Sequence, residues 1–186
     1  MANTNDETRL IVRLRSESND NSVQFSPLSK SWNPSELKDI SSLAKWSLSS
    51  NKEAFGVDRL HDGNLDTYWQ SDGPQPHYIN MYFHKCWAIA QVSVYLDFKQ
   101  DESYTPRQIA LRVGNRVQDL YQISQLELNE PSGWIDILVS DPDKPPIKAF
   151  MLQLLVLSNH QGGKDTHVRQ VKIMQHKHDG SIEHQS

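Results

Sequence analysis

Two histidines and an aspartate stand close together in the stretch "SNHQGGKDTHVRQ", which follows the apolar run "FMLQLLVLS". Imidazole and carboxylate groups bind transition metals and move protons in catalysis. The spacing of His160, Asp165 and His167 matches no strong zinc pattern, and a structural zinc site has four ligands, usually with thiolates among them. A catalytic interpretation lacks a nucleophile beside these groups. We therefore expect no metal, no cofactor and no catalysis at this stretch.

Two other interpretations of the stretch are a polar turn and a binding surface. Asn, Asp and Gly residues satisfy the geometry of tight turns by themselves. Exposed loops on a rigid scaffold are also a common place for recognition. We expect an exposed loop that binds a partner through these side chains: Asn159, His160, Gln161, Asp165, Thr166 and His167.

Two further loops carry candidate contact residues. In "DESYTP", Ser103 and Tyr104 are expected to share a loop end with residues 159–167, where a tyrosine offers a rigid contact with one hydroxyl group. The alternative is that this segment is only a turn, in which Asp101 caps the local backbone. In "TYWQSDG", three polar residues are expected to face outward: Gln70, Ser71 and Asp72. Three basic residues are expected on an ordinary solvated face: Lys164, Arg169 and Lys172.

The segments between these loops alternate apolar and polar residues with a period of two, which is typical of strands. Strands are predicted at 79–83, 90–97, 109–114, 134–139, 150–157 and 171–173. The segment 150–157 is apolar on both faces and is expected to be a central strand. Connections contain Gly, Pro, Asn or Asp, and strands recur about every 10–15 residues. This pattern predicts an all-β antiparallel sandwich with Trp69 and Trp134 largely buried.

Composition bounds the class of protein. The 186 residues suit one domain with two polar tails, at 1–37 and 176–186, of which the first is expected to be mostly flexible. A short helix is expected to start at Asn33. The net charge of −4 disfavours nucleic-acid binding. The single cysteine, Cys86, excludes an internal disulfide. No apolar segment reaches the roughly 20 residues that span a membrane. We expect a soluble protein of a reducing, intracellular compartment.

One segment is far more specific than these general patterns: "KWSLSSNKEAFGVDRLHDGNLDTYWQSDGPQPHYINMYF". Its Trp-Ser-x-Ser-Ser opening, Leu-x-Asp-Gly-x-x-x-Thr-x-Trp centre and Ser-x-Gly-x-x-Pro loop resemble the discoidin-like, galactose-binding jelly roll. Together with "DESYTP", "LELNEPSGWI" and "LSNHQGGKDTHVRQVKI", they resemble the DOC-domain subunits of the anaphase-promoting complex over about residues 40–175. Residues 38–175 are therefore assigned to a DOC-domain jelly roll.

The resemblance implies a role without catalysis. In that family the domain works inside a ubiquitin ligase beside scaffold and TPR subunits, and forms with a WD40-propeller coactivator the co-receptor for the destruction-box degron. The candidate residues would then contact the degron and promote processive ubiquitination of cell-cycle substrates, in the nucleus and the cytoplasm. At the end of the sequence, "IEHQS" stands in place of the Ile-Arg pair by which members dock a TPR subunit. Two alternatives stay open: an intracellular carbohydrate-binding module, and a hydrolase using His160, Asp165 or His167.

Overall fold

The computed structural model describes residues 10–12 and 32–177, in which β-strands predominate. The strands are β1 (Leu10–Val12), β2 (Leu37–Asp39), β3 (Ala44–Leu48), β4 (Trp69–Gln70), β5 (His77–Asp97), β6 (Pro106–Gly114), β7 (Tyr121–Glu127), β8 (Ser132–Leu138), β9 (Lys148–Asn159), β10 (His167–Val168) and β11 (Gln170–His176). The short helix α1 (Phe98–Asp101) and the 3-10 turns η1 (Pro34–Glu36), η2 (Ser41–Leu43), η3 (Val57–Leu60), η4 (Glu102–Tyr104), η5 (Val117–Asp119) and η6 (His160–Gly162) connect them.

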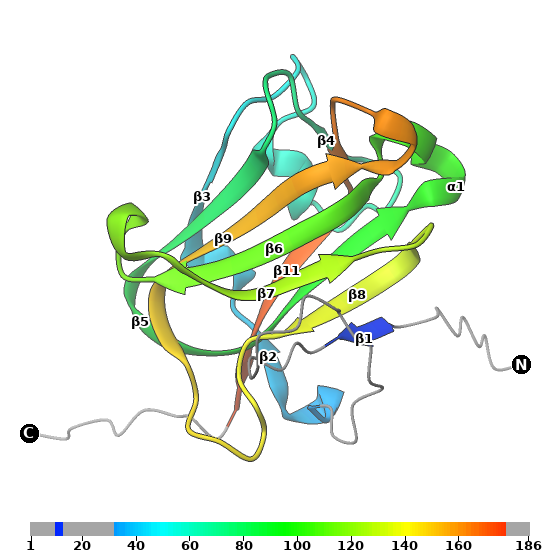
Figure 1. The fold of residues 1–186 in the computed structure, drawn as a ribbon. Helices are drawn as coiled ribbons and strands as arrows, with labels where there is room; N and C mark the ends of the chain where they lie inside the picture. Colours follow the sequence, from blue (N-terminus) through cyan, green and yellow to red (C-terminus); the bar gives the residue numbers. More distant parts are fainter. Residues whose placement is uncertain (1–9, 13–31, 178–186) are drawn as a thin grey trace, which may run out of the picture.

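The long strands form two layers that enclose the core (Figure 1). One layer has the strand order β3-β5-β9-β6-β7 and the other has the order β1-β8-β5-β11-β2. Among the described residues, every pairing is antiparallel except the parallel pairing of β1 with β8. The prediction of an antiparallel β-sandwich is confirmed.

The strand β5 is 21 residues long and belongs to both layers. Its first half pairs with β3 and β9, and its second half pairs with β8 and β11. The register with β9 shifts between Tyr82 and Trp87, where three neighbouring side chains are exposed: His84, Lys85 and Cys86. The strands predicted at 79–83 and 90–97 are therefore one strand, because extended backbone continues through an irregularity of this kind without a turn.

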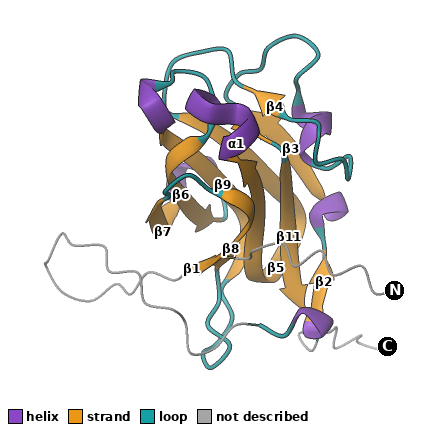
Figure 2. Cartoon of the chain, turned by 90° about the vertical axis from the view of Figure 1, so that its right-hand side faces the viewer, coloured by secondary structure: helices purple, strands orange, loops and turns teal. Residues whose placement is uncertain are grey.

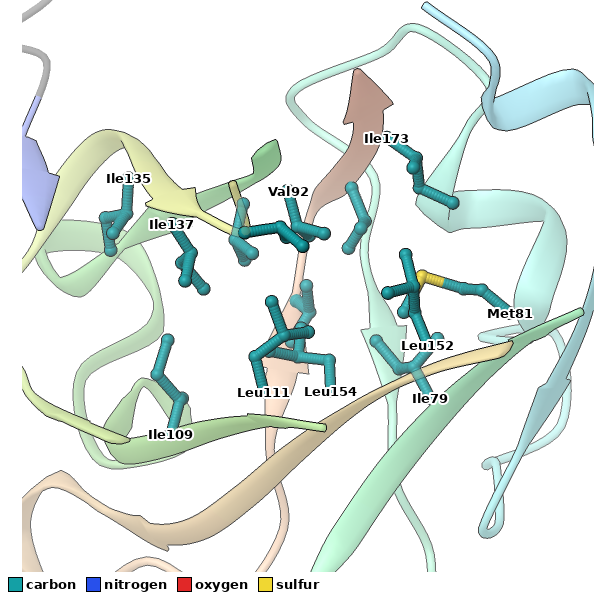
Figure 3. Packing of buried hydrophobic residues seen from close by; sticks show 14 of the residues in the cluster. Ile79, Met81, Val92, Ile109, Leu111, Ile135, Ile137, Leu152, Leu154 and Ile173 are labelled. Atoms are coloured by element: carbon teal, nitrogen blue, oxygen red, sulfur yellow. The ribbon is translucent and has the colours of Figure 1, made fainter. Parts of the chain in front are cut away.

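The core consists of the inward-facing residues that the alternation predicted. Ile79 and Met81 are fully buried, and Figure 3 shows them beside Leu152. At the other side of the same cluster, Ile135 of β8 lies across from Ile109 of β6. Burying each such side chain stabilises the fold by about 1.5–3 kcal/mol, so this cluster holds the two layers together.

The strand β9 is central, as predicted, since it pairs with β5 on one edge and with β6 on the other. The inward-facing Leu154 and the outward-facing Leu155 are both buried. Phe150, near the start of the strand, is the exception and is 38% exposed. A strand covered on both faces is a rigid support for the loop that follows it.

Of the two tryptophans expected in the core, only one is fully buried. Trp69 has no exposed surface, and its indole Nε1 donates to the carbonyl oxygen of Ser50 at 2.9 Å. Trp134 is half-buried, and its ring meets that of Tyr95 edge-on with centroids 5.4 Å apart. Trp134 is less buried than Trp69 because it precedes the inward-facing Ile135, and neighbouring strand residues point to opposite faces.

The boundaries of the folded part differ from those expected. The helix expected from Asn33 is the single turn η1, capped by Asn33 Oδ1, which accepts the Ser35 N–H at 3.1 Å. It ends there because Leu37 is buried in β2. The sheet also includes β1, within the expected N-terminal tail, and reaches His176 in β11. The rest of both predicted tails lies outside the described residues.

The helices in the described part of the chain are all short. None of them, over residues 10–12 and 32–177, has the length and apolar character needed to cross a membrane.

Candidate functional site

The loops that carry the candidate residues meet at one end of the sandwich, next to β4 and α1 in Figures 1 and 2. Pairing of β4 with β10 places Gln70 opposite His167. The turns η4 and η6 contact each other, and a Cβ added to Gly163 would stand 1.8 Å from the carbonyl oxygen of Ser103. The structure therefore brings all three candidate loops together.

Asn159 shapes the 159–167 loop from inside. It is only 5% exposed, although it was expected to face solvent. Its side-chain Nδ2 donates to the carbonyl oxygens of Gly163 at 3.3 Å and Asp165 at 2.8 Å. The buried His77 donates from Nε2 to the carbonyl oxygen of Lys164 at 2.6 Å. Donors from the core thus bind three successive carbonyl groups, which holds the loop in one conformation.

His160 is also buried, with 8% of its surface exposed. Its Nε2 accepts the backbone N–H of Glu130 at 3.1 Å. Its Nδ1 carries the proton and donates to the carbonyl oxygen of Thr105 at 3.0 Å. The expectation of an exposed histidine was wrong, because both ring nitrogens bind loops distant in sequence. His160 positions those loops and has no ring nitrogen left for a partner.

His167 is enclosed in the same way and is 7% exposed. Its Nδ1 lies 3.0 Å from Asp101 Oδ1, and its Nε2 lies 3.2 Å from Gln70 Oε1. Its ring stacks between Tyr68 and Tyr104, with centroid distances of 4.0 and 4.2 Å. The exposure expected for Gln70 and His167 was wrong, since each is the hydrogen-bond partner of the other.

Arg169 was expected on a solvated face, yet it is 3% exposed. It binds Asp101 with two hydrogen bonds, from Nε to Oδ2 at 2.8 Å and from Nη2 to Oδ1 at 2.9 Å. Burial raises the pKa of Asp101, but hydrogen bonds from His167 and Arg169 and the charge of Arg169 outweigh it and hold that pKa below its ordinary value. The alternative interpretation of Asp101 as a local cap is wrong, since its side chain makes no cap hydrogen bond to η4. Nothing near Asp101 in the sequence signals its partners 66 and 68 residues away.

Ser71 was expected to face outward but is fully buried. Its hydroxyl accepts the Thr166 N–H at 2.9 Å, donates toward Asp165 Oδ1 at 3.3 Å and lies 3.3 Å from His77 Nε2. In a catalytic triad the histidine stands between serine and aspartate. Here Asp165 faces the serine directly and His77 donates to a backbone carbonyl. The group fixes the loop and holds no accessible nucleophile.

Thr166 is buried as well, and its hydroxyl donates to the carbonyl oxygen of Tyr104 at 3.3 Å. This bond ties the 159–167 loop to η4. Five candidate residues do reach the surface, of which two are half-buried and three are exposed: Ser103, Asp165, Asp72, Tyr104 and Gln161. The candidate set thus separates into a buried frame and an exposed layer that a partner can contact.

Backbone strain gathers at the same end. The described residues other than glycine that adopt positive φ are Ala54, Glu102, Glu130 and Gln161, with φ between 45° and 68°. All four lie in the loops around β4, α1 and η6. Such conformations cost on the order of 1–3 kcal/mol each and concentrate at functional sites.

The structure does not assemble the metal site considered for His160, Asp165 and His167. The two imidazoles bind different groups, and no cluster of three or more potential ligands from His, Cys, Asp and Glu occurs among residues 10–12 and 32–177. The arrangement suits contact with a partner through exposed side chains.

The fold has close structural counterparts of low sequence identity. The family 32 CBM of Clostridium perfringens NanJ, solved in complex with galactose, aligns with a TM-score of 0.63 at 12% identity and covers 75% of this chain and 99% of its own. An F5/8 type C domain from Bacteroides fragilis aligns with a TM-score of 0.62 at 15% identity, over 77% of this chain and 99% of its own. These likenesses confirm the jelly-roll fold.

Relatives at higher identity share more than the fold. Anaphase-promoting complex subunit 10 of Homo sapiens is 52% identical over 146 residues, 78% of this chain and 79% of the relative. The protein of that name in Drosophila melanogaster is 49% identical over 74% of this chain and 70% of the relative. Subunit DOC1 of Saccharomyces cerevisiae is 34% identical over 73% of this chain and 55% of the relative. The family model "Anaphase-promoting complex, subunit 10 (APC10)" matches residues 11–185, so this chain belongs to that family and is a subunit of the anaphase-promoting complex.

Proposed function

We propose that this chain is a non-catalytic subunit that forms, with a WD40-propeller coactivator, the co-receptor for destruction-box substrates of the ligase. Membership in the family supports a place in the complex. The observation that carries the proposal is the exposed layer at one end of the sandwich, formed above all by Tyr104, Gln161 and Asp72 over a buried frame held by hydrogen bonds.

This layer is preorganised for binding. Tyr104 is 40% exposed, but its inner face stacks on His167 and its carbonyl oxygen accepts from Thr166. A side chain that is already ordered loses less entropy when a partner binds. A tyrosine also presents a large apolar ring together with one hydroxyl group, a combination common at binding hot spots. A short extended peptide would therefore be held with few contacts.

Weak binding at this end suits a shared receptor. If the coactivator holds one part of the degron, the second contact becomes intramolecular, and residence lengthens although neither contact is tight. Longer residence permits more ubiquitin transfers in one encounter. Binding to scaffold and TPR subunits, and residence in the nucleus and the cytoplasm, belong to the same proposal.

The proposed absence of catalysis is supported by the geometry of the one serine-histidine-aspartate group at this end. Ser71 has no exposed surface, and its hydroxyl is occupied by Thr166 and Asp165. No cofactor enters the proposed role, since peptide recognition needs only the hydrogen bonds and apolar contacts of the exposed residues.

Single-encounter ubiquitination by the assembled ligase tests the proposal. The double variant Tyr104→Ala, Gln161→Ala is expected to assemble normally and to shorten the chains on destruction-box substrates. The control is Tyr121→Ala, since Tyr121 is 55% exposed at the far end of the β6–β7 hairpin. Substrates without a destruction box report any general loss of activity. Normal chain lengths in a fully assembled double variant would reject the co-receptor role.

The alternative is an intracellular carbohydrate-binding module, supported by the fold shared with the galactose-bound NanJ domain. Direct binding of galactose and its oligosaccharides to the purified chain, measured by calorimetry, separates the two functions. The co-receptor proposal expects no saturable sugar binding, and sugar binding lost in Tyr104→Ala would favour the alternative.

A further inference from the structure

A groove runs beside the candidate site, on the side of η6 that faces the loop between β7 and β8. Its inner surface includes Leu128, Pro131 and the ring of His160, all of them buried. Asn129 and Gln161 form its exposed rims. None of Leu128, Asn129 and Pro131 was among the candidate residues.

Three hydrogen bonds hold the wall formed by residues 128–131. The N–H of Leu128 donates to the Arg107 carbonyl oxygen at 2.7 Å, and that of Glu130 donates to His160 Nε2 at 3.1 Å. The Phe98 N–H donates to the carbonyl oxygen of Pro131 at 2.8 Å. The loop is therefore fixed to β6, η6 and α1, and the groove keeps its shape.

Both walls of the groove, residues 128–131 on one side and η6 on the other, contain strained backbone. Glu130 has φ of 45° and Gln161 has φ of 52°, and neither is a glycine. The hydrogen bond between Glu130 and His160 joins the two walls at this point. Strain that the surrounding contacts maintain on both sides of a groove is characteristic of binding sites.

The chemistry of the groove selects the class of ligand. The side-chain amides of Asn129 and Gln161 hydrogen-bond to no other residue that the structure describes, so both can donate to and accept from a peptide backbone. Arg107 and Glu127 close the groove with an ion pair of 2.9 Å and neutralise each other. An uncharged ligand that combines peptide groups with small apolar side chains fits this surface.

We propose that the groove is a second binding site for substrate polypeptide, which takes an uncharged extended segment flanking the destruction box. The inference rests on the proposed function, because the segment reaches the groove from the Tyr104 surface. The path is short: Ser103 packs against Gly163, and Gln161 belongs to the same turn η6 that borders the groove. One peptide can therefore contact Tyr104, cross Gln161 and enter the groove.

Peptide binding to the assembled complex with its coactivator tests the groove. A minimal destruction-box peptide is compared with two peptides that carry about eight further uncharged residues at one end or the other, long enough to span roughly 26–29 Å. We expect one extension to strengthen binding about three- to tenfold, the effect of one or two hydrogen bonds. Asn129→Ala and the bulky Asn129→Trp should abolish this gain without weakening the minimal peptide. Asn115→Ala, at an exposed site in the β6–β7 turn, is the matched control.

The outcomes separate the two proposals. If neither extension strengthens binding, or if the gain survives Asn129→Trp, the groove is not a substrate site. Tyr104→Ala reports on the co-receptor role by itself, since it should weaken the minimal and the extended peptides alike. An unchanged affinity of Tyr104→Ala for the minimal peptide would count against the co-receptor role, while the extension gain would still decide the groove.

Discussion

Tyr104 stacks on His167, with ring centroids 4.2 Å apart and ring planes inclined by 17°. On the opposite face of the imidazole, Tyr68 stacks at 4.0 Å. An exposed residue of the candidate surface is thus supported by a buried one, which is itself held by Asp101 and Gln70. The contact surface and the stability of this end are therefore linked through His167.

His167→Ala is expected to lower the free energy of unfolding by about 2–4 kcal/mol, because it removes two stacking contacts and two hydrogen bonds. His167→Phe keeps the stack and loses only the hydrogen bonds, so it should retain part of the difference. Urea unfolding followed by tryptophan fluorescence measures both. His84→Ala is the control, since His84 is exposed at the irregularity of β5. Equal stability of His167→Ala and His84→Ala would show that the stack contributes nothing.

Asp101→Asn is expected to lower the stability at pH 7 by about 3–5 kcal/mol, because it leaves Arg169 buried without its charged partner. The folded pKa of Asp101 is below its ordinary value, so the stability it contributes is present above about pH 3.9 and is lost as the pH falls further. Unfolding measured from pH 7 to pH 2 should therefore show the variant and the parent converging below about pH 4. The control is Asp58→Asn at an exposed position, and a difference independent of pH would contradict the assignment.

Asn159→Ala and Gln161→Ala should differ sharply although the two residues are nearly adjacent. Asn159 is buried and donates to two loop carbonyls, so its loss is expected to cost about 1–3 kcal/mol. Gln161 is exposed, and truncating its side chain should change stability by less than about 0.5 kcal/mol. Thermal unfolding of both variants under identical conditions tests this. A joint replacement of residues 159–161 and 165 would mix the two effects, so single variants are required to separate stability from binding.

Gln170→Ala is expected to loosen the loop that follows η3. Three oxygen atoms surround the Gln170 side-chain Nε2, which lies 3.0 Å from Arg59 O, 2.7 Å from Asp62 Oδ1 and 3.1 Å from Asn64 O. Without that donor we expect a loss of about 1–3 kcal/mol and faster amide exchange of Gly63, whose N–H donates to Gln170 Oε1 at 3.2 Å. Hydrogen exchange resolved by peptide gives the readout. Unchanged protection of this segment would mean that the backbone alone maintains the loop.

The candidate site is expected to function without a bound transition metal. Elemental analysis of dialysed protein should find less than stoichiometric zinc, copper or nickel, since His160 and His167 already use both ring nitrogens within the fold. One equivalent of metal that disappears in His160→Ala would overturn this expectation.

Local patterns in the sequence were sufficient for the architecture. The alternation at 79–83 and 90–97 predicted which residues face the core, because neighbouring residues of a strand point to opposite sides wherever the strand lies. The segment 150–157 is apolar on both faces, which predicted a central strand, and β9 does pair with β5 on one edge and β6 on the other. The long motif from Lys45 to Phe83 indicated the family, and the candidate loops do meet at one end.

Only the tertiary structure decided which polar residues face outward. The sequence shows Asn159 and Gln161 as similar amides in one loop, yet one is buried and the other exposed. His167 is enclosed by Asp101, which is 66 residues away, and by Gln70, which is 97 residues away. Burial of a loop side chain depends on which other loops cover it, and that is set by the packing of distant segments. Strand alternation is a property of the local backbone and can therefore be read from sequence, whereas the division of this site into a buried frame and an exposed layer cannot.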